Sequence, residues 1–195
     1  MSLTLRCSGA LLAGGASSRM GCPKADIEFG GMTLAQRAAA TLQALTAEVV
    51  QVGGEPIAAL DLPHFPDRRQ GAGPLAGVET ALARVEVPLV VLAVDLPLVP
   101  PELLEEALRS VEHGAEICAP QWSGRWHPLC AVYSPGVLAH IEARLDAGDY
   151  GLQGLLEELG TALPEEVLTG LGDPAAMLHN INTREDLERA RAFLA

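Results

Sequence analysis

Apolar, β-branched runs alternate with amphipathic stretches along the first part of the chain. Three runs are typical of buried strands, and three stretches carry apolar side chains at helical spacing. The expected strands are residues 5–13, 48–52 and 88–94, and the expected helices are residues 34–45, 73–84 and 101–111. Strands and helices in this order predict parallel strands joined by helical crossovers. We therefore expect an α/β fold with three layers around a doubly wound, mostly parallel sheet.

The pattern changes after residue 115, where strands no longer alternate regularly with helices. We expect strands at residues 115–119 and 129–133 around a loop or hairpin at 121–128, then helices at 137–145 and 152–159, and a last helix from residue 183. Thr183 and Asp186 have the spacing of a capping box, which marks the start of that last helix. No repeat or linker divides the sequence, so residues 1–195 are expected to form one domain.

The charge and hydropathy of the chain exclude two classes of partner. The formal net charge of -12 excludes nucleic acid, because a phosphate backbone is bound by a basic stripe. No apolar run approaches the roughly 18 residues that a membrane helix needs. The N-terminus does not have the pattern of a signal peptide, so we expect a cytoplasmic protein without a membrane partner.

The four cysteines do not predict a metal site or a disulfide. Cys7, Cys118 and Cys130 lie in apolar runs and are expected to be small buried side chains, whereas Cys22 lies in a polar loop. Their spacing contains no Cys-x-x-Cys pair.

A glycine-rich loop, residues 14–24, follows the first expected strand. Its glycines allow the backbone to approach phosphate groups closely and to direct N–H groups at their oxygens. Arg19 adds a positive charge, as does Lys24, the single lysine of the chain. The spacing is not that of a P-loop or of the dinucleotide-binding fingerprint. The alternative is a surface turn with solvated cations, but a loop at the carboxyl end of a strand favours ligand binding.

Asp95 follows the most apolar expected strand, at the edge of the sheet where open α/β folds bind ligands. A carboxylate held there can bind Mg²⁺, which prefers oxygen ligands and often bridges phosphates. The alternative is that Asp95 only hydrogen-bonds the turn before Pro97.

Two further segments carry candidate binding groups. Residues 73–77, Gly-Pro-Leu-Ala-Gly, begin a helix whose N–H groups can bind an anion, although helix initiation alone also explains them. Asn180 and Asn182 project to the same side if their segment is extended, where their amides offer donors and acceptors to a polar ligand or a metal. The alternative is loop chemistry before the capped last helix. His127, before Pro128 and an expected strand, is the histidine expected to line a site.

Together these motifs resemble the molybdenum cofactor guanylyltransferase family, within the wider nucleotidyltransferase superfamily. The resemblance is carried by residues 12–24, 73–77, 95–97, 127–128 and 180–187, in this order, and it spans most of the chain. It implies a Rossmann-like nucleotidyltransferase fold, with residues 1–112 as the nucleotide-binding half and 113–195 as the acceptor-binding half. It also implies an enzyme that uses Mg²⁺ to transfer GMP from GTP to the phosphate of molybdopterin, releasing pyrophosphate.

The resemblance also assigns roles to particular residues. Catalysis would involve Arg19, Lys24 and Asp95, and Asp95 would hold the metal. The remaining implied contacts are Leu12, Ala13, Gly14 and Gly15 to the guanine nucleotide, Asp67 to the nucleoside, and Asn180 and Asn182 to the pterin. Two positions depart from the family pattern: Pro23 stands where an acidic residue is frequent, and Val52 where a base-contacting Asn can occur.

Two other functions stay open at this point. A related enzyme could use CTP, or act on a sugar or polyol phosphate, and a non-catalytic nucleotide-binding domain would share much of the pattern. Lys24 together with Asp95 favours an enzyme, because simple binding does not require a metal carboxylate. Besides GTP and the molybdenum cofactor, transient contact with proteins that deliver or accept the cofactor is compatible with the sequence, which does not identify them.

Overall fold

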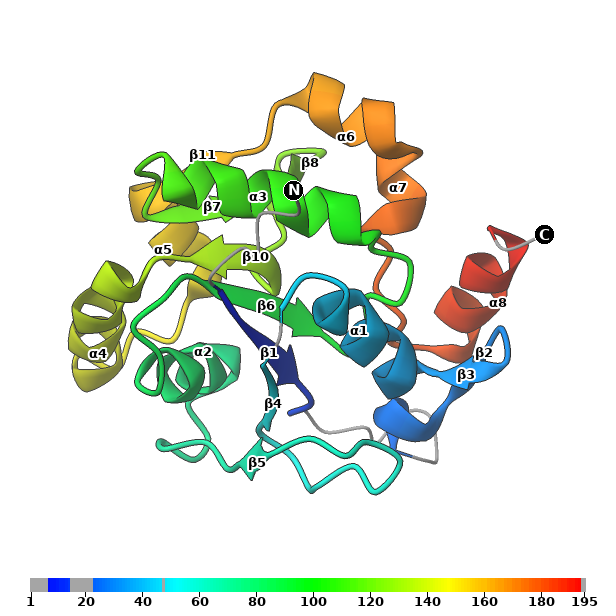
Figure 1. Ribbon diagram of the computed structural model, residues 1–195, viewed down its shortest axis with the longest axis horizontal. Helices are drawn as coiled ribbons and strands as arrows, with labels where there is room; N and C mark the ends of the chain where they lie inside the picture. The colour runs from blue at the N-terminus through cyan, green and yellow to red at the C-terminus, as the bar shows by residue number, and fades with distance from the viewer. Residues whose placement is uncertain (1–6, 15–22, 47, 194–195) are drawn as a thin grey trace.

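Seven strands form the central sheet of the computed structural model, which describes residues 7–14, 23–46 and 48–193 (Figure 1). Their order across the sheet is β11 (Gly160–Ala162), β7 (Ile117–Ala119), β10 (Cys130–Tyr133), β6 (Leu89–Ala93), β1 (Ser8–Leu12), β4 (Val49–Val52) and β5 (His64–Phe65). Neighbouring strands are parallel except where β10 pairs with β6 and β7. The predicted doubly wound, mostly parallel sheet is confirmed.

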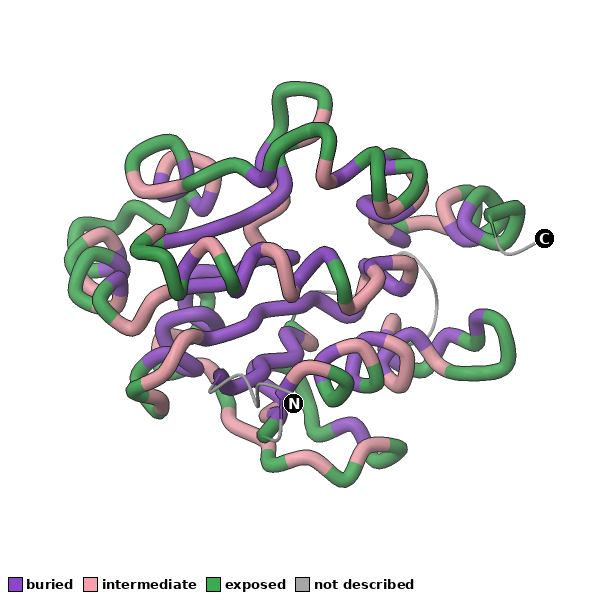
Figure 2. The backbone as a smooth tube through the Cα atoms, turned by 45° about the horizontal axis from the view of Figure 1, so that its top comes forward, coloured by how far each residue is buried: buried purple, intermediate pink, exposed green. Residues whose placement is uncertain are grey.

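The alternation of side chains along β6 shows why the fold has three layers. Val90 and Leu92 belong to a core shared with α1 (Leu34–Gln43), α3 (Pro101–Glu112), α6 (Glu165–Leu171) and α7 (Pro174–Met177). Leu89 and Val91 belong to a core shared with α2 (Pro74–Leu82), α4 (Leu138–Asp146) and α5 (Leu152–Leu159). The strand is therefore buried on both faces, as its continuous apolar sequence predicts. Figure 2 colours the segments at the centre of the molecule as buried.

A third, smaller core brings the end of the chain to the carboxyl edge of the sheet. It joins the hairpin of β2 (Glu28–Phe29) and β3 (Met32–Thr33) to α8 (Arg184–Ala192), and Figure 1 shows these elements side by side. The predicted capping box at the start of α8 is present: Asp186 N–H donates to Thr183 Oγ1 at 3.1 Å, and Thr183 N–H donates to Asp186 Oδ2 at 2.8 Å. Ile181 is fully buried between these elements.

Residues 121–128, expected to form a loop or hairpin, form an antiparallel hairpin of β8 (Gln121–Trp122) and β9 (Arg125–Trp126). Its positive φ angles at Ser123 and Gly124 are those that a tight hairpin turn requires. Several other short elements differ from the sequence expectation. A 3-10 turn, η1 (Lys24–Asp26), and a second one, η2 (Pro135–Val137), were not predicted, nor were β2, β3, β5, β11, α6 and α7.

The buried cysteines are as predicted. Cys7, Cys118 and Cys130 are free and buried, and burial raises the pKa of the Cys7 thiol to about 11. Cys22 lies outside the described residues.

Of the helices that the structure describes, none is both long enough and apolar enough to cross a bilayer.

Candidate functional site

The carboxyl ends of β1, β4 and β6 lie side by side and form the floor of the candidate site. Leu12, the last residue of β1, is in register with Val52 of β4 and Ala93 of β6. Leu12 is buried, Ala13 is half-buried and Gly14 is exposed, so the chain emerges from the core at this point. Two other predicted residues of this loop, Gly15 and Arg19, lie outside the described residues.

The turn after β4 passes so close to β1 that it cannot carry side chains. A Cβ atom on Gly54 would lie 2.7 Å from the backbone oxygen of Ala13, and φ is positive at both Gly53 and Gly54. Glycine tolerates this backbone conformation and this approach. Val52, at the position where a base-contacting Asn can occur, is 1% exposed and belongs to the core. This part of the site therefore presents backbone rather than polar side chains.

Asp67 lies at the centre of three glycines. Its carboxylate oxygens would be 3.2 to 4.0 Å from Cβ atoms built on Gly14, Gly53 and Gly77. Partial burial raises the pKa of Asp67 above its usual value, while nearby His64 opposes the shift. Within the described chain, no hydrogen bond is made to this carboxylate, so its oxygens can accept bonds from a ligand.

Lys24, Asp95 and Asn182 form the polar centre of the site. Lys24 Nζ donates to Asp95 Oδ2 at 3.1 Å and to Asn182 Oδ1 at 2.8 Å. The segment that carries Asn182 is held to the loop after β6, because the backbone N–H of Ile181 donates to the backbone oxygen of Asp95 at 2.9 Å. Because the side chain of Asp95 is bonded to Lys24, Asp95 is better explained as a residue of the site than as one that only stabilises the turn before Pro97.

The oxygens around Lys24 fit a hard divalent cation such as Mg²⁺ better than a softer metal that prefers sulfur or nitrogen ligands. Asp95 Oδ1 is buried, and nothing in the described residues hydrogen-bonds it. Asn182 Oδ1 is a second hard oxygen nearby, and Mg²⁺ is bound by one or two such groups together with phosphates and water. The described residues hold no cluster of three or more His, Cys, Asp and Glu side chains that could bind a metal. A cation here would depend on phosphate oxygens to complete its coordination.

A cavity of about 200 Å³ adjoins this centre on the side of the β8–β9 hairpin. Its lining residues are Pro74, Leu96, Arg125, Trp126, His127, Pro128, Leu129, Leu152, Gln153 and Asn180. Leu96 directly follows Asp95, so the cavity and the polar centre share one loop. Gln153 fixes the wall of the cavity: its amide accepts from Trp126 N–H at 3.2 Å and donates to the backbone oxygen of Trp126 at 2.9 Å.

The charge of the cavity comes from Arg125 and not from His127. Burial, reinforced by the neighbouring Arg125, lowers the pKa of His127 to about 4, so its ring is neutral near pH 7. The combination of one guanidinium, a neutral imidazole, an aromatic ring and the amide of Asn180 suits a polar heterocycle that carries negative charge.

The segment 73–77 begins a helix, as predicted, and it also borders the cavity; anion binding by its N–H groups stays a prediction. Pro74 is the first residue of α2, so the segment initiates a helix. Pro74 also lines the cavity, and Gly77 leaves the space in which Asp67 and Leu12 meet α2.

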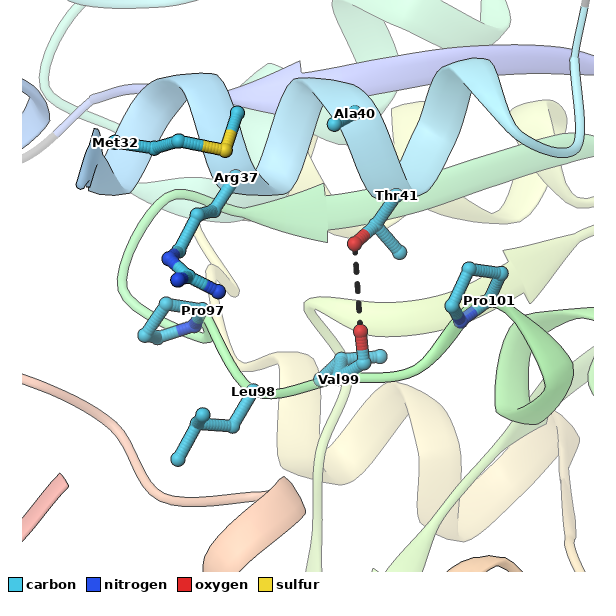
Figure 3. A pocket seen from close by; sticks show the side chains of 8 residues that line it. All are labelled: Met32, Arg37, Ala40, Thr41, Pro97, Leu98, Val99 and Pro101. Carbon is cyan, nitrogen blue, oxygen red and sulfur yellow. Dashed lines mark hydrogen bonds between the residues drawn. The ribbon is translucent and has the colours of Figure 1, made fainter. Parts of the chain in front are cut away.

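A second hollow, of about 380 Å³, lies between α1 and the loop after β6 (Figure 3). Its described lining is mostly apolar, and the one charged side chain in that part of the lining, Arg37, already binds backbone oxygens. Arg37 donates to the backbone oxygens of Phe29 at 2.7 Å and Gly30 at 3.0 Å and lies over the Phe29 ring. We assign no ligand to this hollow.

Residues 9–163 match the family described as "MobA-like NTP transferase domain". The chain belongs to this family. It is 35% identical over 97% of its length to a probable molybdenum cofactor guanylyltransferase from Pelotomaculum thermopropionicum, 94% of which is covered. It is 32% identical over 96% of its length to the molybdenum cofactor guanylyltransferase of Rhizobium johnstonii, 92% of which is covered.

A solved structure gives the same result. The molybdopterin-guanine dinucleotide biosynthesis protein A from Archaeoglobus fulgidus superposes with a TM-score of 0.81 at 26% identity, covering 96% of this chain and 98% of that one. The fold of this MobA-like nucleotidyltransferase is therefore the one that its motifs predicted.

The structure brings most of the predicted site residues of this MobA-like transferase to one edge of the sheet. It gives the two asparagines different neighbours, since Asn182 contacts Lys24 and Asn180 lines the cavity. Sequence reasoning missed Arg125 and Gln153. Arg125 lies two residues before His127, so its closeness to the His-Pro motif could have identified it. No feature of the sequence distinguishes Gln153.

Proposed function

We propose that this MobA-like transferase is a molybdenum cofactor guanylyltransferase, which transfers GMP from GTP to the terminal phosphate of molybdopterin. The main observation in support is that Lys24 contacts both Asp95 and Asn182 at the carboxyl edge of the sheet, next to a separate cavity. One edge thus offers phosphate and metal groups beside a pocket for a second substrate. The names of the relatives support the same assignment.

In the proposed reaction, an oxygen of the acceptor phosphate attacks the α-phosphorus of GTP. A new phosphorus–oxygen bond forms, the bond between the α-phosphorus and the bridging oxygen breaks, and pyrophosphate leaves with the bonding electrons. The attacking phosphate is already ionised near neutral pH, so no general base is required. The enzyme must instead hold two anions together, and Lys24 contributes a full positive charge at that place.

Asp95 Oδ1 and Asn182 Oδ1 are the groups we propose to hold the Mg²⁺ ion, together with phosphate oxygens. Bound there, the ion would neutralise charge on the phosphates during transfer. This proposal moves Asn182 from the pterin side, which the family resemblance implies, to the nucleotide and metal side. Asn180 keeps the pterin role because it lines the cavity with Arg125 and His127.

The remaining assignments concern the nucleotide and the location of the enzyme. We propose that the backbone of residues 12–15 contacts the nucleotide, that Asp67 accepts hydrogen bonds from the nucleoside, and that Arg19 contacts its phosphates. The division into a nucleotide half, 1–112, and an acceptor half, 113–195, is part of this proposal, with Asn182 as its exception. The cytoplasmic location and transient contacts with cofactor-delivering or cofactor-accepting proteins remain predictions.

The experiment that tests the proposal supplies the purified protein with molybdopterin, Mg²⁺ and one of GTP, CTP, ATP or UTP. Mass spectrometry of the pterin product identifies the nucleotide transferred, and pyrophosphate release gives the rate. We expect the guanine dinucleotide and the fastest pyrophosphate release with GTP. A cytosine dinucleotide formed at an equal or higher rate would move the protein to the CTP-using enzymes, and the absence of any dinucleotide would overturn the proposed activity.

A further inference from the structure

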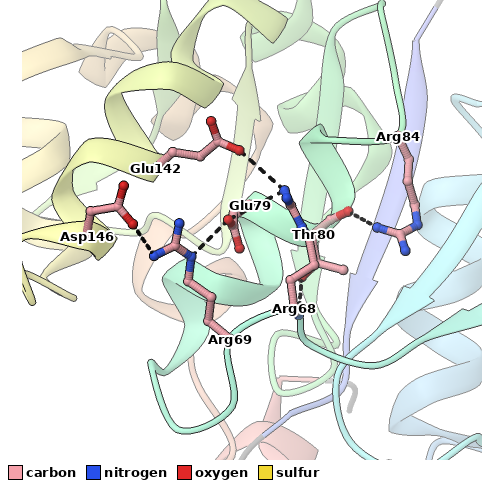
Figure 4. Close-up of polar contacts among 7 residues, drawn as sticks. All are labelled: Arg68, Arg69, Glu79, Thr80, Arg84, Glu142 and Asp146. Atoms are coloured by element: carbon pink, nitrogen blue, oxygen red, sulfur yellow. Dashed lines mark hydrogen bonds and ion pairs between the residues drawn. The ribbon is translucent and has the colours of Figure 1, made fainter.

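The two residues that directly follow Asp67 are arginines held by a buried carboxylate of α2. The side chain of Glu79 is 1% exposed. Arg69 Nε donates to Glu79 Oε1 at 3.1 Å, and Arg68 Nη1 lies 3.5 Å from the same oxygen (Figure 4). The backbone N–H of Arg68 donates to Thr80 Oγ1 at 2.9 Å, so two consecutive residues of α2 hold the chain next to Asp67.

The same arginines also reach α4. Arg68 Nη1 lies 3.3 Å from Glu142 Oε1, and Arg69 Nη1 lies 2.5 Å from Asp146 Oδ1. Figure 4 shows Arg69 between the two helices, with one carboxylate on each side. The loop after β5 is therefore tied to α2 and α4 at the residues next to Asp67.

Stability alone is a weak explanation for this arrangement. Burying a carboxylate is unfavourable unless its oxygens are paired, and apolar replacements of buried ion pairs are often neutral or stabilising. Glu79 Oε2 is buried, and no group among the described residues hydrogen-bonds it. A costly charge placed next to a site residue points to a positional role.

Asp67 depends on its backbone for its position. Its carboxylate packs against three glycines, and the described residues make no hydrogen bond to it. Because no side chain among the described residues hydrogen-bonds it, the carboxylate moves whenever the segment 67–69 moves. Binding groups held in place before the ligand arrives avoid the entropic loss of ordering them on binding.

We propose that Glu79 and Arg69 are positioning residues that hold Asp67 in the geometry required to bind the nucleoside of GTP. This inference rests on the proposed function. It predicts that Arg69 influences GTP affinity only through Asp67, because the guanidinium is tied to Glu79 and Asp146 and not to the floor of the site.

A double-mutant cycle on GTP affinity tests the proposal, using Arg69→Ala, Asp67→Ala and the double variant of the full chain. We expect Arg69→Ala to raise the Kd of GTP about 5- to 10-fold, which lies within the range of interaction free energies found between residues that share partners. In the Asp67→Ala background, Arg69→Ala should change the Kd less than about twofold. The KM of the acceptor and kcat at saturating GTP should be unchanged, a separation that general loss of stability would not produce.

Three further variants sharpen the cycle. Arg109→Ala is the matched control, because Arg109 pairs with two glutamates on α3, Glu105 and Glu106, and should leave the Kd unchanged. Arg69→Lys should restore GTP affinity in part, since a compact ammonium lacks the planar fork with which Arg69 reaches Glu79 and Asp146 together. Glu79→Gln keeps the shape of the side chain and removes its charge. Its Kd for GTP should lie between the values for Arg69→Ala and for the unaltered protein.

The possible outcomes separate this inference from the proposed function. Additive effects of Arg69→Ala and Asp67→Ala, or a Kd for Arg69→Ala equal to that for Arg109→Ala, would overturn the positioning role. If the unaltered protein binds and transfers GTP but Asp67→Ala has no effect on the Kd, the positioning role fails and the proposed function stands. If the unaltered protein does not bind GTP, the proposed function fails and this inference fails with it.

Discussion

The polar centre around Lys24 and the cavity under the β8–β9 hairpin share one edge of the sheet but are built differently. The centre gathers charged and amide groups from three distant segments, since Asp95 lies 71 positions and Asn182 lies 158 positions after Lys24. Among the described residues that line the cavity, Arg125 is the single cation, and burial keeps His127 neutral. The first arrangement suits phosphates and a metal, and the second suits an extended heterocycle.

This difference shows how an open α/β sheet can serve two substrates. Parallel strand ends place backbone N–H groups and short polar loops where a nucleotide can bind. The antiparallel strand β10 and the hairpin before it break that pattern and add a wall beside the strand ends. Irregular topology on one side of the sheet thus creates room for a second substrate.

The largest expected effect concerns the polar centre. Asp95→Ala should lower kcat/KM by roughly 100-fold or more, because it removes the carboxylate proposed for the metal, a contribution of several kcal/mol. The fold should survive, since the hydrogen bond from Ile181 goes to the backbone of Asp95. Turnover at several Mg²⁺ concentrations measures the effect, with exposed Asp61→Ala as the control. Near-normal turnover with unchanged Mg²⁺ dependence would return Asp95 to the role of a turn residue.

Lys24→Ala should have the next largest effect and should act on the nucleotide. Loss of a charge-assisted phosphate contact, worth roughly 1.5–3 kcal/mol, weakens GTP binding by about 10- to 150-fold. Lys24→Arg should rescue only in part, because a planar fork replaces a compact ammonium. Calorimetric titration of GTP with Mg²⁺ measures the affinity. Equal affinities for the alanine variant and the unaltered protein would exclude Lys24 from the nucleotide site.

Arg125→Ala should act on the other region. It should raise the KM of the molybdopterin acceptor by about 10-fold. This corresponds to the low end of the free energies of charge-assisted hydrogen bonds, because Arg125 is exposed. The Kd of GTP should not change. Steady-state kinetics with varied acceptor check this, with Arg109→Ala as a control of equal charge. An effect on GTP instead of the acceptor would contradict the separation of the two regions.

The smallest expected effect is a pH dependence of stability that originates in the cavity. The pKa of His127 is lowered from 6.5 to about 4 in the folded protein. At a pH between these two values, the unfolded chain therefore binds a proton at His127 more readily than the folded protein does. His127 therefore costs no stability above about pH 6.5, and its destabilising effect grows as the pH falls toward 4. Urea unfolding at pH 7 and pH 5 should show a smaller loss for His127→Asn than for the unaltered protein. The exposed His140→Asn should behave like the unaltered protein, and equal losses in all three would place His127 in solvent.

The parts of the molecule that the sequence predicts are those with a regular pattern. Apolar runs define β1, β4 and β6, and a polar residue at the end of such a run, like Asp95, falls at the ligand-binding edge. The short strands β5 and β11 escape this reasoning because they have two and three residues and lack fully buried positions. Prolines on both sides of His64 and Phe65 further obscure β5.

Contacts between distant side chains are harder to predict than elements. The sequence placed Lys24 and Asn182 at one edge, but their direct contact depends on how α8 packs against the β2–β3 hairpin. Glu79 lies in a correctly predicted helix, yet its ion-pair partners are arginines in another loop, a pairing that the local sequence does not indicate. Gln153 was missed because its partner is the backbone of Trp126, and backbone groups carry no sequence signal.

The separation of the two regions is tested most directly by comparing Asn180→Ala with Asn182→Ala. The two residues are two positions apart, so each variant controls for the local effect of the other. The measurement is the Kd of GTP with Mg²⁺ and the KM of molybdopterin for both variants. We expect Asn182→Ala to weaken GTP binding and leave the acceptor KM unchanged, and Asn180→Ala to raise the acceptor KM and leave GTP binding unchanged. If both variants impair only the acceptor, Asn182 belongs to the pterin site and the metal site proposed here is wrong.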